Sequence, residues 1–158
     1  MVSAAVMAAP VSADTVRTLL ATIHDPEIPT VSIVDLGLIH SISVAGERIA
    51  IELLPTFVAC PALEIIRSSV VDAVTVLGRP VDVSFTFAVP WTTDRLTDAG
   101  NAGLRRAGIA PPAEPSAVRC PFCAGADVAM DSAFGPALCR SLFYCRTCRQ
   151  PFEAFKPI

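Results

Sequence analysis

The chain has 158 residues, of which 53% are hydrophobic, and its formal net charge is −3. Alanine and valine supply much of this apolar content, and no uninterrupted apolar run approaches the roughly 20 residues that a membrane-spanning helix needs. The composition therefore argues against a membrane protein and allows either one ordinary domain or a small domain with a metal-stabilised module.

The first residues, 1–12, are apolar and rich in small side chains but lack the basic start of a signal peptide. We expect this segment to be disordered and the protein to be cytoplasmic. In that compartment thiols stay reduced, so six cysteines, four of them in Cys-x-x-Cys pairs, indicate metal or redox chemistry rather than disulfides.

The first regular elements are a helix and a hairpin. Apolar residues spaced three and four apart predict a short amphipathic helix over residues 14–23. Two prolines within residues 24–29 then force an extended or turning path. Alternating apolar residues predict two strands, 38–44 and 48–54, joined by a tight turn.

A longer helix and a third strand follow. Residues 61–77 have the apolar spacing of a helix that packs on one face, and residues 81–87 alternate as a strand. A helical crossover makes this strand parallel to the one before it. With a last helix over 93–106, residues 13–107 are predicted to form an α+β, two-layer domain in the order αββαβα.

A proline-rich linker, residues 108–118, is predicted to separate this domain from a cysteine-rich module over residues 119–158. Two Cys-x-x-Cys pairs in that module have the spacing of a zinc ribbon. They consist of Cys120 and Cys123, then Cys145 and Cys148. Structural zinc is the expected metal; the same four thiolates also suit a single iron of the rubredoxin type.

Cys60 stands at the start of the 61–77 helix, where free N–H groups favour a thiolate. We interpret it as a metal ligand or reactive thiol, against the alternative of a small residue packed under the sheet. Cys139 and Cys145 fall on one expected strand about 20 Å apart, so they cannot share a zinc ion. For Cys139 we predict a buried or half-exposed thiol rather than a ligand.

Several motifs of this chain resemble the PaaD family, the D subunits encoded with the multicomponent phenylacetyl-CoA oxygenase (epoxidase). In chain order they are Asp25-Pro26-Glu27-Ile28-Pro29, Val34-Asp35-Leu36-Gly37-Leu38, Thr56 through Cys60-Pro61-Ala62, and Pro90-Trp91-Thr92-Thr93-Asp94. The two cysteine pairs follow them. The resemblance covers nearly the whole chain after the first dozen residues, and it extends to a wider family of small iron–sulfur assembly and carrier proteins.

The resemblance implies a non-catalytic accessory protein of phenylacetate degradation. Its expected partners are the reductase of the oxygenase, which would receive an iron–sulfur cluster, or the di-iron component, which would receive metal. Cys60 would bind the transient cluster or iron, and residues around it would shape the site: Asp25, Glu27, Asp35, Thr93 and Asp94. A homodimer is left open, because one thiol seldom holds a cluster. Many members of the family end in Phe-Lys-Cys, whereas this chain has Phe155-Lys156-Pro157.

Other classes of function fit the sequence less well. An electron carrier would need redox-active iron in the ribbon. A nucleic-acid-binding ribbon would use the arginines near the cysteine pairs, which are Arg119, Arg140, Arg146 and Arg149; the small charge imbalance argues against a strong phosphate-binding surface. The sequence shows no Ser-His-Asp pattern and no glycine-rich phosphate loop, so we expect no enzyme.

Overall fold

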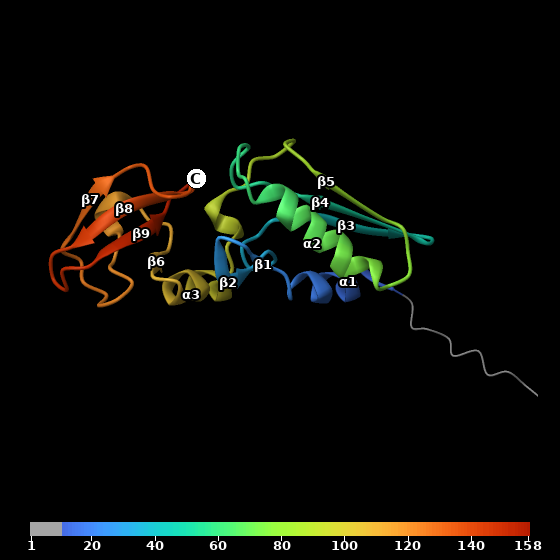
Figure 1. The fold of residues 1–158 in the computed structure, drawn as a ribbon, viewed down its shortest axis with the longest axis horizontal. Coiled ribbons are helices and arrows are strands. Elements are labelled where there is room, and N and C mark those ends of the chain that lie inside the picture. Colours follow the sequence, from blue (N-terminus) through green and yellow to red (C-terminus); the bar gives the residue numbers. More distant parts are fainter. Residues whose placement is uncertain (1–10) are drawn as a thin grey trace, which may run out of the picture.

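A computed structural model describes residues 11–158. The sequence predicts a disordered segment over residues 1–12, and residues 1–10 of that segment lie outside the described part. The first module, residues 11–107, and the ribbon module, residues 108–158, lie side by side along the long axis (Figure 1). Ser12 caps helix α1, Ala13–Leu20, because its Oγ accepts a hydrogen bond from the Thr15 N–H at 3.1 Å.

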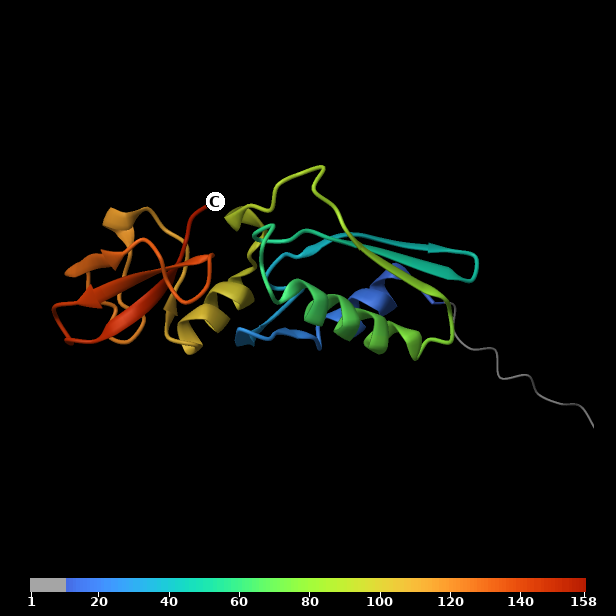
Figure 2. The same cartoon turned by 45° about the horizontal axis from the view of Figure 1, so that its top comes forward.

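The first module contains the predicted three-stranded sheet, in the order β3-β4-β5. β3 (Ile39–Ala45) and β4 (Arg48–Leu53) form an antiparallel hairpin, and β5 (Val81–Phe85) pairs parallel to β4. Helix α2, Leu63–Thr75, is the crossover between β4 and β5. Figure 2 shows α1 and α2 on one side of this sheet. The α+β, two-layer prediction is confirmed.

Alternation explains how the core of this module forms. Every second residue of β4 is buried, and α2 buries residues at a spacing of four. Together with buried residues of α1, these positions form a continuous apolar layer between the sheet and the helices. The buried residues are Ile49, Ile51 and Leu53 of β4, Ile66, Val70 and Val74 of α2, and Val16 and Leu20 of α1.

The helix predicted over 93–106 is wrong at its start. Thr93–Arg95 is a single 3₁₀ turn, and helix α3 begins only at Asp98 and ends at Arg106. Thr97 causes the break, because its Oγ1 accepts from the Gly100 N–H at 3.0 Å and donates to Asp35 Oδ1 at 2.7 Å.

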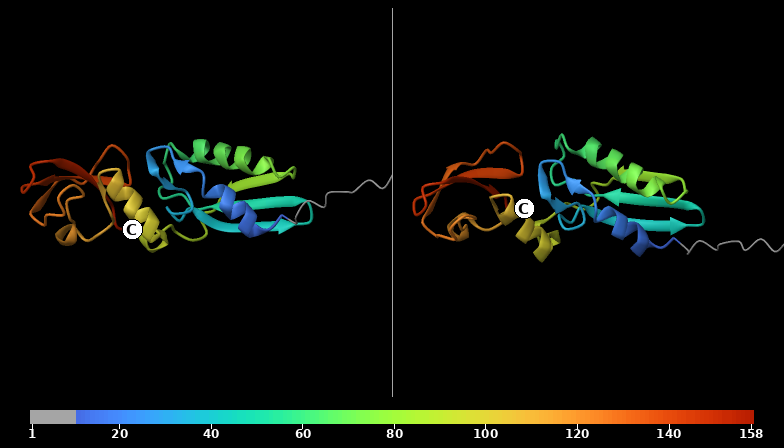
Figure 3. Two further views of the ribbon diagram at one scale, coloured as in Figure 1. Left: turned by 90° about the horizontal axis from the view of Figure 1, so that it is seen from below. Right: turned by 60° about the horizontal axis from the view of Figure 1, so that its bottom comes forward.

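Helix α3 packs closely on a small two-stranded sheet, β1 (His24–Asp25) and β2 (Ile28–Ser32). Gly103 makes this approach possible, since a Cβ there would lie 2.6 Å from the Thr30 carbonyl oxygen. Figure 3 shows α3 and the β1–β2 pair between the two larger sheets.

The ribbon module has a four-stranded sheet in the order β6-β9-β8-β7. Its long strands are β7 (Val128–Ser132), β8 (Arg140–Cys145) and β9 (Pro151–Phe155). The short β6, Ile109–Ala110, pairs parallel to β9, and Pro115–Ala117 forms a 3₁₀ turn, where the sequence predicted an irregular linker over 108–118. Ile109 and Ala110 come before the prolines, so their backbone is free to pair with β9, and both side chains are buried.

The two modules share a packed contact. Phe155 at the end of β9 is buried in the core of the first module, and its ring centroid lies 5.7 Å from that of Trp91. Trp91 donates its indole N–H to the Leu36 carbonyl at 3.0 Å, which holds the ring in place. No helix within residues 11–158 is long and apolar enough to span a membrane.

Candidate functional site

Four cysteines meet in the ribbon module, two before β7, one at the end of β8 and one between β8 and β9. Their sulfur atoms all lie within 4.8 Å of one another, with 3.6 Å between Cys120 and Cys148 and 3.6 Å between Cys123 and Cys145. A tetrahedral zinc site with Zn–S bonds of about 2.3 Å has sulfur–sulfur edges of about 3.8 Å. The four thiols therefore fit a single tetrahedral metal ion.

The two cysteine pairs have the same local backbone. The residue after each second cysteine adopts a left-handed conformation, with φ of 59° at Ala124 and 58° at Arg149. Each turn thereby folds its N–H groups back toward sulfur. The Cys148 N–H, then the Cys148 and Cys123 thiols and the Thr147 N–H, lower the pKa of Cys145 to about 6, whereas burial and the neighbouring thiols raise the pKa of Cys148 to about 12. Metal binding therefore has to displace protons from the cluster.

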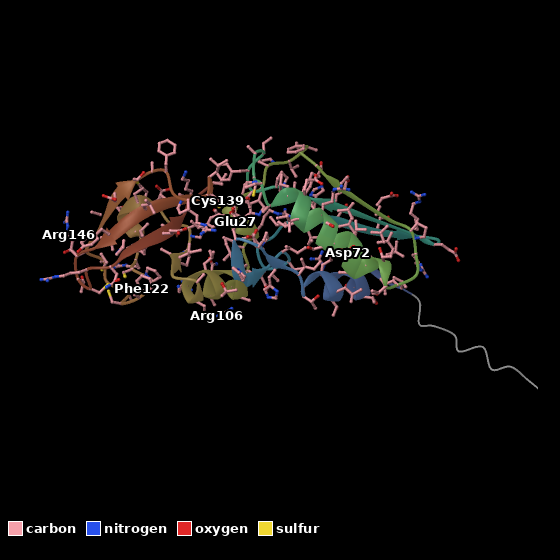
Figure 4. All side chains as sticks on the ribbon, viewed as in Figure 1. Glu27, Asp72, Arg106, Phe122, Cys139 and Arg146 are labelled. Atoms are coloured by element: carbon pink, nitrogen blue, oxygen red, sulfur yellow. The ribbon has the colours of Figure 1, made fainter. Side chains whose placement is uncertain are left out.

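A cavity lies at the junction of the two modules, and we call it the inter-module cavity. It has a volume of about 260 Å³. One wall is the loop before α2 and the other is the β7–β8 loop. The lining residues are Glu27, Thr56, Phe57, Ala59, Cys60, Pro61, Gly135, Pro136, Ala137, Leu138 and Cys139. In Figure 4 the labelled Cys139 and Glu27 lie next to each other at this junction.

Cys60 lines the cavity as a half-buried thiol, two residues before Ala62, the N-cap of α2. The helix start favours a thiolate as predicted, through the Ala62 N–H, but burial outweighs this effect. Burial raises the pKa of Cys60, the Ala62 N–H opposes this effect, and the negative charges of Glu27 and Asp25 raise the pKa further. Cys60 is therefore a neutral thiol at neutral pH.

Cys139 lines the opposite wall of the same cavity. As expected, it lies outside the four-cysteine cluster and is partly buried. Burial raises its pKa, the Arg140 guanidinium opposes this effect, and Glu27 and Asp25 add to it. The charges of the same two carboxylates thus raise the pKa of both thiols. The sequence pattern held no signal for this pairing, because it depends on the contact between modules.

Of the other candidate residues, the structure places only Glu27 at the cavity. Asp35 joins the β2 end to α3, since its carboxylate accepts from Ser32 Oγ at 2.8 Å and from Thr97 Oγ1 at 2.7 Å. Thr93 donates its backbone N–H to the Ile158 carbonyl at 3.1 Å, and Asp94 is exposed on the same turn. Neither Asp35, Thr93 nor Asp94 lines the cavity.

Asp25 shapes the loop that carries Glu27. Its Oδ1 accepts from the Glu27 N–H at 2.8 Å and from the Ile28 N–H at 3.0 Å, and the residue is only 8% exposed. Burial raises the pKa of Asp25, so ionisation of this carboxyl group is unfavourable. Its contribution to the loop is the oxygen atom that accepts the two backbone hydrogen bonds.

Asp25→Ala is expected to lower the free energy of unfolding by about 1–3 kcal/mol, because two backbone N–H groups lose their acceptor. Asp25→Asn is the matched control, since its amide oxygen keeps both bonds without the buried charge. Chemical denaturation of the two variants measures the difference. Equal destabilisation by both would contradict this role for the acceptor.

Comparison with known proteins identifies relatives of both modules. Residues 13–86 match the family described as iron-sulfur cluster assembly protein, and residues 107–156 match the PaaD zinc beta ribbon domain. A protein of Escherichia coli (strain K12), named as the D subunit of 1,2-phenylacetyl-CoA epoxidase, is 39% identical over 158 residues. That match covers 95% of this chain and 96% of the relative.

Solved structures resemble the first module. A domain of unknown function, DUF59, from Bacillus anthracis is 23% identical, with a TM-score of 0.54 over 58% of this chain and 89% of that chain. A conserved hypothetical protein from Thermotoga maritima is 26% identical, with a TM-score of 0.52 over 58% of this chain and 92% of its own. These structures support the same α+β fold.

Proposed function

This chain belongs to the family of D subunits of 1,2-phenylacetyl-CoA epoxidase, and on that premise we propose that it is an accessory protein that matures the metal centres of the epoxidase. It carries iron, or an iron–sulfur cluster, to the reductase or the di-iron component of the oxygenase. It is not itself a catalyst. The match of its first module to the iron-sulfur cluster assembly family supports this role.

The observation that carries the proposal is the position of Cys60. Its thiol lies outside the four-cysteine cluster and lines a cavity that Glu27 also lines, and the Glu27 carboxylate lies 3.8 Å from the Arg140 guanidinium. The cluster uses all of its ligands on one structural metal ion, for which we propose zinc. Cys60 remains available to bind cargo.

The raised pKa of Cys60 suits a carrier. Iron binding needs a thiolate, so it must displace a proton from Cys60, and this competition weakens binding at neutral pH. The positive charge of iron offsets the nearby carboxylates while the cargo is bound. When the cargo leaves, the thiol takes its proton back, which favours release to a client.

Coexpression tests this function. The epoxidase components are produced with the wild-type chain, with Cys60→Ala, or with Ser68→Ala, whose side chain is exposed on α2 away from the cavity. We expect Cys60→Ala to lower iron and acid-labile sulfide in the purified components severalfold and Ser68→Ala to have no effect. The zinc content and thermal stability of each variant are measured in parallel to establish that it is folded.

Equal iron and sulfide contents with wild type and Cys60→Ala would remove Cys60 from the mechanism. A deficit confined to sulfide in the reductase would identify a cluster as the cargo, whereas a deficit confined to iron in the di-iron component would identify metal supply.

A further inference from the structure

The chain has six cysteines, and the two outside the four-cysteine cluster line one cavity. Cys60 comes from the loop before α2 in the first module, and Cys139 comes from the residue before β8 in the ribbon module. Neither module alone contains both thiols. The packing of the ribbon on the first module is what brings them to a common space.

Glu27 gives this space a third donor. It lines the cavity, and its charge acts on both thiols, as their pKa shifts show. Two sulfur donors and one carboxylate suit a thiophilic transition metal such as iron. The rest of the lining is largely apolar, with Phe57, Pro61 and Leu138 among its members, so few protein groups compete for the ion.

Arg140 positions Cys139 beside Glu27. Its guanidinium donates to Glu153 Oε2 at 2.6 Å and to the Glu27 backbone carbonyl at 3.1 Å, so it joins the first residue of β8 to the first module. Its side chain is only 9% exposed, and its Nε has no hydrogen-bond partner. The guanidinium also acts on the Cys139 sulfur, where it favours the thiolate that a metal needs.

We propose that Cys60 and Cys139 together bind the iron cargo, one thiolate from each module, with Glu27 as a third donor. This inference rests on the proposed function, in which Cys60 carries iron, and adds the second protein thiol that a single cysteine lacks. The ribbon module thereby contributes a ligand to the carrier site in addition to its own metal centre.

The site is built to bind loosely. Among residues 11–158 the four cysteines of the ribbon are the one preformed group of three or more ligand side chains. Cys60, Cys139 and Glu27 must therefore close on the ion, through movement of the loops that carry them. Part of the binding free energy is spent on ordering these loops, so the site binds its ion more weakly than a rigid site would and releases it more readily to a client.

Cobalt titration tests this site directly. Protein with one zinc ion in the ribbon is titrated anaerobically with Co²⁺, which does not displace zinc from four thiolates because zinc binds more tightly. We expect the wild type to bind one further Co²⁺ with a thiolate-to-cobalt absorption band. Cys60→Ser and Cys139→Ser are each expected to weaken this binding at least about tenfold, since losing a ligand exceeds the loss of an outer-shell partner.

Ala137→Ser is the matched control, because it places a hydroxyl in the same cavity and leaves both thiols. It is expected to bind Co²⁺ like the wild type. Zinc content and thermal unfolding establish that each variant is folded. Loss of binding in Cys60→Ser with wild-type binding in Cys139→Ser would overturn the two-thiol site and leave the proposed function standing. Absence of thiolate-bound Co²⁺ in the wild type would overturn both.

Discussion

Removal of the metal from the four-cysteine cluster is expected to unfold the ribbon module while the first module stays folded. The ribbon has 48 residues beyond its β6 strand, and a chain of that size buries little surface with which to fold unaided. Its own core contains few large side chains, chiefly Phe143 and Phe152, whose rings stack at 5.7 Å. A structural zinc contributes about 10–16 kcal/mol of apparent binding free energy, which far exceeds what this core supplies.

Trp91 is a natural probe of this transition. It is the only tryptophan of the chain, and it packs on Phe155 at the end of β9. Unfolding of the ribbon removes Phe155 and exposes the indole to water, so we expect a red shift of its fluorescence emission on treatment with a strong chelator. Amide exchange should lose protection in β8 and β9 and keep it in α2 and β4.

Cys145→Ser is expected to reproduce the effect of the chelator, because it removes one buried ligand. Cys139→Ser is the control, since it removes a cysteine outside the cluster and should keep one zinc per chain. Persistent protection of β8 and β9 after complete metal removal would contradict the structural role. A Cys60→Ser variant, which lacks the carrier thiol, that contained one iron ion and no zinc per chain after anaerobic preparation would contradict the assignment of zinc to the ribbon.

Arg140→Ala is expected to lower the free energy of unfolding by about 3 kcal/mol, the second largest effect. The substitution leaves Glu153 without its partner at 2.6 Å and removes the hydrogen bond to the Glu27 carbonyl. Breaking a fully buried ion pair typically costs about 3–5 kcal/mol. We expect the lower end because the Glu153 side chain is 28% exposed and water partly screens it.

Arg48→Ala provides the comparison within the same chain. The Arg48–Asp82 pair is exposed on both sides, so its loss should cost no more than about 1 kcal/mol. Denaturant unfolding of the two variants, followed by Trp91 fluorescence, measures both values. If the two variants are equally destabilised, Arg140 does not hold the modules together. Arg140→Ala should also weaken cobalt binding at the inter-module cavity, because it frees the residue next to Cys139.

The fold of the first module was largely predictable because its information is local. Alternation in β4 and the spacing of buried residues in α2 depend only on neighbours along the chain. The error over residues 93–97 has a cause that is not local. Thr97 competes with Thr92 and Thr93 as a cap, and its hydrogen bond to Asp35, 62 residues away in the chain, settles the choice. The strand at Ile109 was missed because two buried residues beside a proline-rich stretch show no periodicity.

The candidate site divides in the same way. The spacing of Cys120, Cys123, Cys145 and Cys148 predicted one cluster, because each Cys-x-x-Cys turn brings its two sulfurs together by itself. The interest of Cys60 was visible from its place before a helix. The raised pKa of its thiol could not be predicted from the sequence, because burial and the charges of Glu27 and Asp25 raise this pKa more than the helix N–H group lowers it.

By itself, the sequence determined the three-stranded sheet and the crossover helix of the first module, the four-cysteine cluster and the family to which the chain belongs. Only the tertiary structure decided that Cys139 shares a cavity with Cys60 and that Arg140 joins β8 to the loop of Glu27. The physical reason is the distance along the chain over which each kind of contact acts. Periodicity and turn spacing record contacts between near neighbours in the chain. The inter-module cavity depends instead on how two separately predictable units pack, through the Phe155–Trp91 contact and the contacts of Arg140 with Glu27.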